Sequence, residues 1–147
     1  DNIDVSTLKE IKKAEDEDYT EASGYHATEH VVIESSNMIT GGISQDLGGI
    51  TLGISGLIFI YDGAIGGNGA SKALFDRFES VLERSMFIVK ECPCQNQAGC
   101  PRCTFSYRCG NNNEFLHKYS ALEILQRIND GEETILIEPT EGDRPLV

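Results

Sequence analysis

The pattern of apolar and polar positions along the chain predicts a mixed fold of helices and a short sheet. Apolar side chains recur every three to four positions in two long segments, which is the period of an amphipathic helix. Two short runs of β-type residues lie between those segments. In chain order, the predicted elements are a helix over 24–40, strands at Ile50–Leu52 and Leu57–Tyr61, a helix over 70–90, a helix from a cap at Asn112 or Asn113 to about Ile128, and a strand at Thr134–Ile137.

The fold class that follows is α/β, of the mixed α+β kind, in which two or three helices pack on a small β-sheet. The helix over 70–90 has the clearest apolar face, and we expect this face to cover the sheet. Its members are Leu74, Phe78, Val81, Leu82, Phe87 and Val89.

The distribution of polar residues suggests three parts along the chain. Residues 1–23 are polar and charged, and we interpret them as a linker or a truncated upstream segment. Residues 24–138 carry the predicted elements and form the expected zinc-binding domain, for the reasons given below. The remaining residues, 139–147, are expected to be a flexible tail.

Charge limits the classes of partner. The formal net charge is −12, and the stretch 90–128, with 5 basic and 3 acidic side chains, is the one basic part between two acidic flanks. A phosphate backbone would repel such a domain at long range, so we expect weak autonomous binding to nucleic acid. The sequence contains neither a signal segment nor 18 consecutive apolar residues, so we expect a cytoplasmic protein without a membrane partner.

All five cysteines lie in one short segment, which predicts a metal site. The number is odd and the spacing is Cys92-x-Cys94-x5-Cys100-x2-Cys103-x5-Cys109, which suits a metal in a reducing compartment better than a disulfide framework. A C-x-x-C turn places two thiolates, Cys100 and Cys103, on one zinc ion, and two of the other three cysteines complete a closed structural site. A redox motif, an iron–sulfur cluster and cysteines that are buried without a shared role are the competing interpretations. The four-cysteine loop lies between two predicted helices.

A second motif, His26-x-x-Glu29-His30, matches the inverted zinc-protease signature. On a helix the two histidines lie one turn apart and could share a metal, with Glu29 as general base. The motif needs a third ligand, for which Glu79 and Glu83 are the candidates considered. The competing interpretation is a polar helix face whose imidazoles form hydrogen bonds within the fold or contact a partner.

A glycine-rich turn, Asp62-Gly-Ala-Ile-Gly-Gly-Asn-Gly69, follows the second predicted strand and precedes a helix. Backbone N–H groups at such a position can bind phosphate. The turn lacks the Gly-Lys-Ser/Thr of a Walker A loop and the third glycine of a dinucleotide fingerprint. A tight turn that needs positive φ is therefore the preferred interpretation, with a phosphate contact as the alternative.

Several of these blocks occur together in an order that resembles one family. They are His26-x-x-Glu29-His30, Asp46-Leu47-Gly48-Gly49, Ile60-Tyr61-Asp62-Gly63, Gly66-Gly67-x-Gly69, Gly99-Cys100-Pro101-x-Cys103 and Cys109-Gly110-Asn111. Over about residues 24–128 the chain is similar to the zinc-binding domain near the C-terminus of the mitomycin repair factor family of superfamily 2 DNA helicases. Related domains occur in other helicase-like and phage-defence proteins.

The resemblance implies one structural Zn2+ held by Cys92, Cys94, Cys100 and Cys103, with Cys109 as substitute ligand. It implies a noncatalytic accessory module that shapes an ATP-dependent DNA helicase in DNA repair and guides a strand. The partners would be a helicase core in cis and DNA through the full-length protein. This chain carries no ATPase motif, and no catalytic or cofactor-binding residue is assigned. The alternatives are a zinc hydrolase centred on His26, Glu29 and His30, and a protein-contact scaffold in phage defence.

Overall fold

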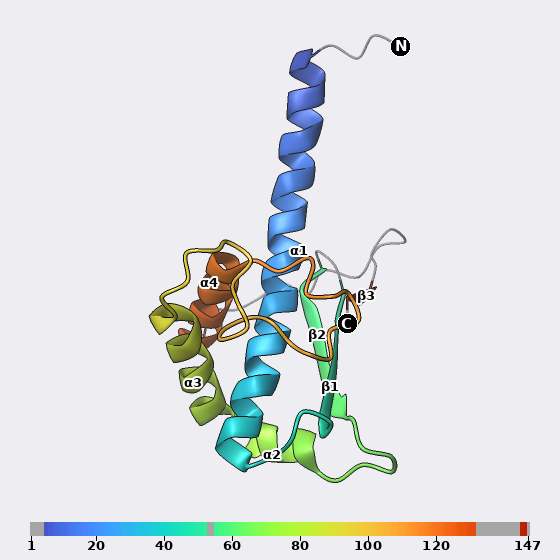
Figure 1. The fold of residues 1–147 in the computed structure, drawn as a ribbon, viewed down its shortest axis with the longest axis vertical. Coiled ribbons are helices and arrows are strands. Elements are labelled where there is room, and N and C mark those ends of the chain that lie inside the picture. The colour runs from blue at the N-terminus through green and yellow to red at the C-terminus, as the bar shows by residue number, and fades with distance from the viewer. Residues whose placement is uncertain (1–4, 53–54, 132–144, 147) are drawn as a thin grey trace.

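The structure, a computed structural model, describes residues 5–52, 55–131 and 145–146, with side chains between Thr20 and Gly131. Within these ranges the chain forms helices and a small antiparallel sheet, which confirms the mixed α+β class (Figure 1). The elements are α1 (Val5–Thr40), β1 (Leu47–Leu52), β2 (Leu57–Asp62), α2 (Ala70–Asp76), α3 (Phe78–Glu91), α4 (Lys118–Asn129) and β3 (Pro145–Leu146).

Helix α1 is the central element of the domain. It runs between α3 and α4 on one side and the sheet on the other, and its N-terminal half projects beyond the body (Figure 1). Ala27 and Val31 are completely buried and join the apolar core. The same stretch also buries polar side chains, namely Ser23, His26, Thr28, Glu29, His30, Ser35 and Ser36. Buried polar groups need partners, so this stretch of α1 is a candidate location for a functional site.

The long helix begins at Val5, so the expected start at Gly24 is wrong. The residues before Gly24 include Leu, Lys, Glu and Ala, which have high helix propensity and allow the helix to start earlier. Gly24 instead lies where α1 crosses α4, because a Cβ at this position would overlap the side chain of Ser120. The absence of a side chain at Gly24 therefore sets how closely the two helices approach.

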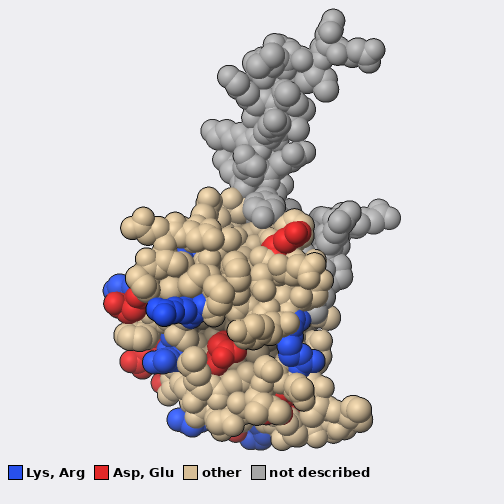
Figure 2. Space-filling view, in the orientation of Figure 1, with Lys and Arg blue, Asp and Glu red and all other residues tan. Residues whose placement is uncertain are grey.

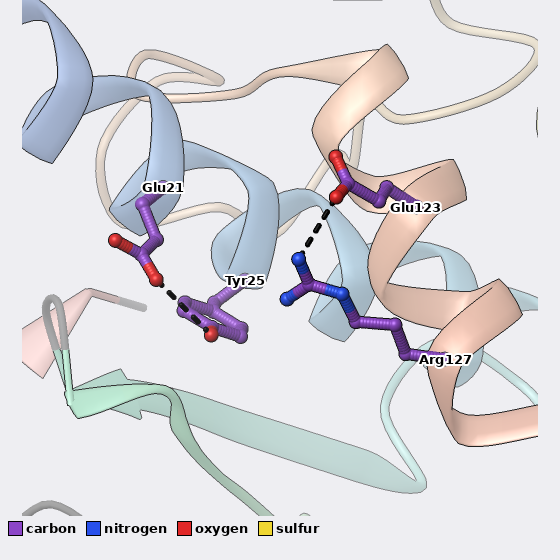
Figure 3. Close-up of polar contacts among 4 residues, drawn as sticks. All are labelled: Glu21, Tyr25, Glu123 and Arg127. Atoms are coloured by element: carbon purple, nitrogen blue, oxygen red, sulfur yellow. Dashed lines mark hydrogen bonds and ion pairs between the residues drawn. The ribbon is translucent and has the colours of Figure 1, made fainter. Parts of the chain in front are cut away.

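Polar contacts border this crossing on its exposed side (Figure 3). The hydroxyl of Tyr25 on α1 donates a hydrogen bond to Glu21, and Arg127 on α4 donates to Glu123 at 2.9 Å. Burial, together with the nearby Glu21 carboxylate, raises the pKa of Tyr25. Both contacts join residues four apart on the same helix, so they support the individual helices more than the crossing.

The sheet has the strand order β2-β1-β3, and both pairings are antiparallel. The strands predicted at Ile50–Leu52 and Leu57–Tyr61 are confirmed, with β1 starting three residues earlier than expected. The predicted strand at Thr134–Ile137 lies outside the described residues. Within the segment 139–147, for which we expect flexibility, the described pair Pro145–Leu146 forms β3 against the end of β1.

The helix predicted over 70–90 is interrupted at Arg77, where φ is −117° and ψ is 27°. Helix α3 packs against α1 and α4, and α2 contacts β2, so the expectation that one helix covers the sheet is wrong. Four predicted core residues, Leu74, Val81, Leu82 and Val89, are buried as expected, but Phe78 and Phe87 are 37% and 55% exposed. None of the helices in the described ranges combines the length and hydropathy of a bilayer span.

The last helix begins at Lys118 and not after Asn112 or Asn113. Both asparagines adopt positive φ, 54° and 58°, which an α-helix excludes. His117 is the N-cap instead, since its Nδ1 accepts a hydrogen bond from the backbone N–H of Ser120 at 3.0 Å. The segment between α3 and α4 therefore runs from Cys92 to His117, and it contains all five cysteines.

Candidate metal centres

Four cysteines of the loop after α3 converge on one point. The Sγ atoms of Cys92, Cys94, Cys100 and Cys103 all lie within 4.8 Å of one another. Cys92 is the C-cap residue of α3, so the first thiol sits at the end of a rigid element. Within the C-x-x-C turn, the N–H of Cys103 donates to the carbonyl of Cys100 at 3.0 Å, which closes the turn.

The spacing of the sulfur atoms fits tetrahedral zinc. A Zn–S bond of about 2.3 Å implies that two ligand sulfurs lie about 3.8 Å apart. The Sγ–Sγ distances are 3.5 Å for Cys92–Cys100, 3.7 Å for Cys94–Cys103 and 3.8 Å for Cys100–Cys103. Backbone N–H groups also point at two of the sulfurs, from Cys100 to Cys103 and from Arg102 to Cys100. The four side chains can hold one metal ion with little rearrangement.

A buried lysine supports this cluster. The Nζ of Lys118, the first residue of α4, donates to the carbonyls of Cys92 and Cys94 at 3.0 and 2.8 Å and approaches the Cys94 sulfur at 3.3 Å. Burial opposes ionisation of Cys94, but hydrogen bonds from Lys118 and the neighbouring thiols lower its pKa to about 7. Burial raises the pKa of Cys103 to about 12, so this thiol keeps its proton at neutral pH until a bound metal ion displaces it.

Gly99 shapes the turn that presents the C-x-x-C pair. Its φ is +98°, a conformation that disfavours other residues, and a Cβ there would overlap Thr104. The hydroxyl of Thr104 donates to the carbonyl of Ala98 at 2.6 Å, so the loop closes on itself around this glycine. The fully buried Thr104 then carries the loop toward α1.

The fifth cysteine lies elsewhere. Cys109 joins His26 and His30 in a second group whose ligand atoms also lie within 4.8 Å of one another. The Cys109 sulfur is 3.7 Å from Nε2 of His26, and the two imidazole centroids are 4.4 Å apart. The structure thus separates Cys109 from the four-cysteine cluster, for which the sequence offers it as a substitute ligand.

Backbone carbonyls orient both imidazoles. Nδ1 of His26 lies 2.9 Å from the carbonyl of Phe115, and Nδ1 of His30 lies 2.8 Å from that of Thr104. A carbonyl only accepts, so each Nδ1 carries a proton, and in the neutral form of each ring Nε2 has a lone pair. Burial, and secondly the neighbouring His26, lower the pKa of His30 to about 4, which keeps that ring neutral.

A pocket of about 130 Å³ opens beside this second group. Glu29, His30, Arg108 and Cys109 contribute to its lining, and β1 forms part of its wall. Glu29 accepts a hydrogen bond from the hydroxyl of Thr51 at 2.5 Å, and burial raises its pKa to about 7. The pocket therefore brings a carboxyl group, an imidazole and a thiol to one small space.

Comparison with known families identifies the domain. The model of the family described as "MZB: MrfA Zn-binding domain" matches residues 28–104, which is more than half of the chain. The chain belongs to the MrfA Zn-binding domain family. The matched region contains all four clustered cysteines and ends before Cys109. The expectation of bound Zn2+ is thereby confirmed, since the family is zinc-binding and the four thiols have the required geometry.

Two relatives show how this MrfA Zn-binding domain occurs elsewhere. An uncharacterised protein of Methanocaldococcus jannaschii is 36% identical over 111 residues, which cover 70% of this chain and 97% of the relative. The crystal structure of the DUF1998 helicase MrfA bound to DNA has the same fold over 76% of this chain, with a TM-score of 0.57 and 21% identity. The matched part is only 15% of that helicase chain.

The expected third ligands of the histidine motif, Glu79 and Glu83, are exposed on α3 and take no part in the second group. Sequence reasoning missed Cys109 as the partner of the histidines because 83 residues separate it from His26. The leftover fifth cysteine was the one signal that could have pointed there, since a four-ligand site uses only four.

The glycine-rich turn of this chain directs its backbone N–H groups to a carboxylate of the turn itself. The carboxylate of Asp62 accepts hydrogen bonds from the N–H groups of Ser71 at 2.8 Å and Gly69 at 3.2 Å. These bonds, that from Ser71 first, lower the pKa of Asp62. The backbone donors that a phosphate would use thus already bind an internal carboxylate, and the tight-turn interpretation accounts for the glycines, with Gly66, Gly67 and Gly69 all at positive φ.

Proposed function

We propose that this chain is a noncatalytic, zinc-stabilised module of an ATP-dependent DNA helicase that acts in DNA repair. Its zinc ligands are Cys92, Cys94, Cys100 and Cys103. The observation that carries the proposal is the closed four-thiol cluster at the junction of α3 and α4. Membership of the MrfA Zn-binding domain family and the shared fold with a DNA-bound helicase supply the context.

The chemistry of the cluster supports a structural role. Four thiolates fill the tetrahedral coordination of zinc and leave no position for water or substrate. The metal would fix the loop between α3 and α4, and both helices pack on α1. Because the loop is polar and rich in turns, the metal contributes directly to the stability of the folded state. The zinc in this proposal therefore holds a shape and does not perform a reaction.

The helicase core and DNA are the proposed partners, the core in cis and the DNA through the full-length protein. The net charge of −12 disfavours strong binding to DNA by this domain alone. Figure 2 shows Lys and Arg side chains interspersed with Asp and Glu on the body of the domain, without a broad basic face in that view. The domain would then shape the motor and guide a strand with low affinity of its own, in the cytoplasm.

Metal analysis of the folded chain tests this proposal. We expect zinc bound to sulfur, and we expect Cys100→Ser and Cys103→Ser to lose that zinc. The isolated chain should show no ATPase activity and only weak, salt-sensitive binding to DNA. A well-folded preparation without metal, or tight DNA binding that salt does not weaken, would contradict the proposal.

A further inference from the structure

We propose that His26, His30 and Cys109 form a second metal site, distinct from the four-cysteine cluster, that binds Zn2+ with an open coordination position facing the pocket. The proposal stands on the convergence of three ligand-type side chains, on the orientation of both imidazoles and on the adjoining cavity. It does not depend on a helicase role.

The distances fit one metal ion. Bonds of about 2.05 Å to nitrogen and about 2.3 Å to sulfur place the two ligand atoms of a tetrahedral site about 3.6 Å apart. Nε2 of His26 and Sγ of Cys109 lie 3.7 Å apart. The two histidines are four residues apart on α1, so one helix face carries both rings, with centroids 4.4 Å apart. Two imidazoles and one thiolate are a set of ligands that zinc favours.

The surroundings of the imidazoles are those of metal ligands. In metal sites a histidine commonly donates its other N–H to a backbone carbonyl or a carboxylate, which fixes the tautomer and the ring orientation. His26 and His30 both do so, to the carbonyls of Phe115 and Thr104. His30 is only 6% exposed, and its Nε2 atom is buried without a hydrogen-bond partner among the described residues. An acceptor buried in this way costs stability unless something binds it, and a metal ion would satisfy it.

The second site would leave one coordination position of the metal free, whereas the four-cysteine cluster leaves none. Among the residues that the structure describes, three ligand-type side chains converge, and His30 and Cys109 also line the pocket of about 130 Å³. Three protein ligands with a fourth position for water or a small ligand are the arrangement of reactive zinc sites. The carboxyl group of Glu29 lines the same pocket, where it can form a hydrogen bond to a ligand in that fourth position. The pocket would admit a water molecule or a small anion.

The two sites would be coupled through the loop. Thr104, whose carbonyl orients His30, directly follows Cys103, and the same loop carries Cys109 and Phe115. A metal on the four cysteines would order the segment that brings the third ligand and both carbonyls to α1. Loss of the first site should therefore empty the second, whereas loss of the second should leave the first intact. This asymmetry is specific to the proposal.

Metal stoichiometry of the full chain provides the test. We expect about two zinc ions per wild-type chain, about one in Cys109→Ser and in His30→Gln, and neither in Cys103→Ser. The third histidine offers a matched control, because His117 lies at the N-cap of α4 and outside both groups. His117→Gln should keep both ions. Circular dichroism checks that Cys109→Ser, His30→Gln and His117→Gln retain the fold, so that the test of the second site does not depend on the less stable Cys103→Ser.

X-ray absorption at the zinc edge of the wild-type protein provides a test that needs no variant. The proposal requires the outer-shell scattering of imidazole, which a four-thiolate site cannot produce. A wild-type chain with about one zinc and sulfur scattering alone overturns the second site and leaves the four-cysteine proposal standing. A folded chain without zinc overturns both. One zinc with imidazole scattering overturns the four-cysteine assignment and the coupling between the sites, and it leaves the site at His26, His30 and Cys109 standing.

Discussion

The two thiol-containing groups of this domain are built in opposite ways. The four-cysteine cluster comes from twelve consecutive residues, 92–103, and its parts meet through tight turns within one loop. The second group joins a buried face of α1 to a cysteine 83 residues away from His26. The first group can form wherever the loop can turn, whereas the second exists only after α1, the sheet and the loop have packed together.

The two groups also differ in charge and access. Zn2+ on four thiolates carries a net charge of about −2, whereas Zn2+ on two neutral imidazoles and one thiolate would carry about +1. A buried cation, Lys118, accompanies the first group, and a pocket with the Glu29 carboxyl group accompanies the second. A negatively charged, closed metal suits a structural role, and a positively charged, open one suits the binding of a small ligand.

Replacement of Cys103 should produce the largest effect. Cys103→Ser removes a buried sulfur of the four-cysteine cluster, and we expect the free energy of unfolding to fall by more than about 4 kcal/mol. The reason is that binding of a structural metal contributes directly to folding. Urea denaturation with and without a chelator measures the change, and the chelator should have little further effect on the variant.

Cys109→Ser is the matched control for that experiment, because it removes a cysteine of the same loop from the other group. Its loss of stability should be clearly smaller, and a chelator should still destabilise it strongly. Equal losses in the two variants would contradict the division of the five cysteines into two groups.

Removal of the lysine charge should produce an intermediate effect. Lys118→Met keeps the length of the side chain but leaves the carbonyls of Cys92 and Cys94 without their buried donor. We expect a loss of about 1–3 kcal/mol and a zinc affinity that is 10- to 100-fold lower. Competition with a chelator measures the affinity. Lys72→Met is the control, since the Lys72 side chain is 78% exposed, and it should change neither quantity appreciably.

The sequence predicts the first group well because its determinants are local. Spacing alone places Cys100 and Cys103 in one turn, and the family resemblance adds Cys92 and Cys94. The strands were also predictable, since each is a short β-type run next to a turn. The prediction fails where the structure depends on distant contacts. Gly24 is typical of a helix start in the sequence, but the structure places it inside α1, where its missing side chain makes room for Ser120.

The second group could not be completed from the sequence. The histidine spacing on one helix face is local and was recognised, but the third member arrives by tertiary packing. Glu79 and Glu83 follow the motif at a suitable distance along the chain, yet α3 directs them to solvent. The break at Arg77 and the packing of α3 on α1 and α4 decide this, and neither can be deduced from the period of apolar residues.

Replacement of His117, the histidine outside both metal groups, should have a smaller effect on stability. His117 accepts the N–H of Ser120, and burial lowers its pKa, so the folded state favours the neutral ring. The neutral ring therefore stabilises the folded state at pH values above the unfolded pKa of about 6.5. This stabilisation is lost as the pH falls through the pKa of His117 in the folded state. His117→Ala should cost about 1 kcal/mol at neutral pH. His117→Asn should retain the cap and lose less stability than wild type on acidification from about pH 7.5 to about 5.5.

Comparison of His117→Asn with wild type at each pH cancels the acid sensitivity of the metal-binding thiols, which both proteins share. Urea denaturation at the two pH values therefore isolates the histidine. If the two proteins lose equal stability, the neutral imidazole of His117 is not the cap.

The smallest expected effect concerns the ion pair on α4. Glu123→Gln removes the contact with Arg127, but both side chains are more than half exposed, at 66% and 52% (Figure 3). Solvent screens such a pair, so the free energy of unfolding should change by about 0.5 kcal/mol or less. Thermal unfolding in low and high salt measures it. A loss comparable to that of Lys118→Met would mean that this exposed pair within α4 stabilises the domain as strongly as the buried lysine of the metal loop does, which contradicts the expected order of effects.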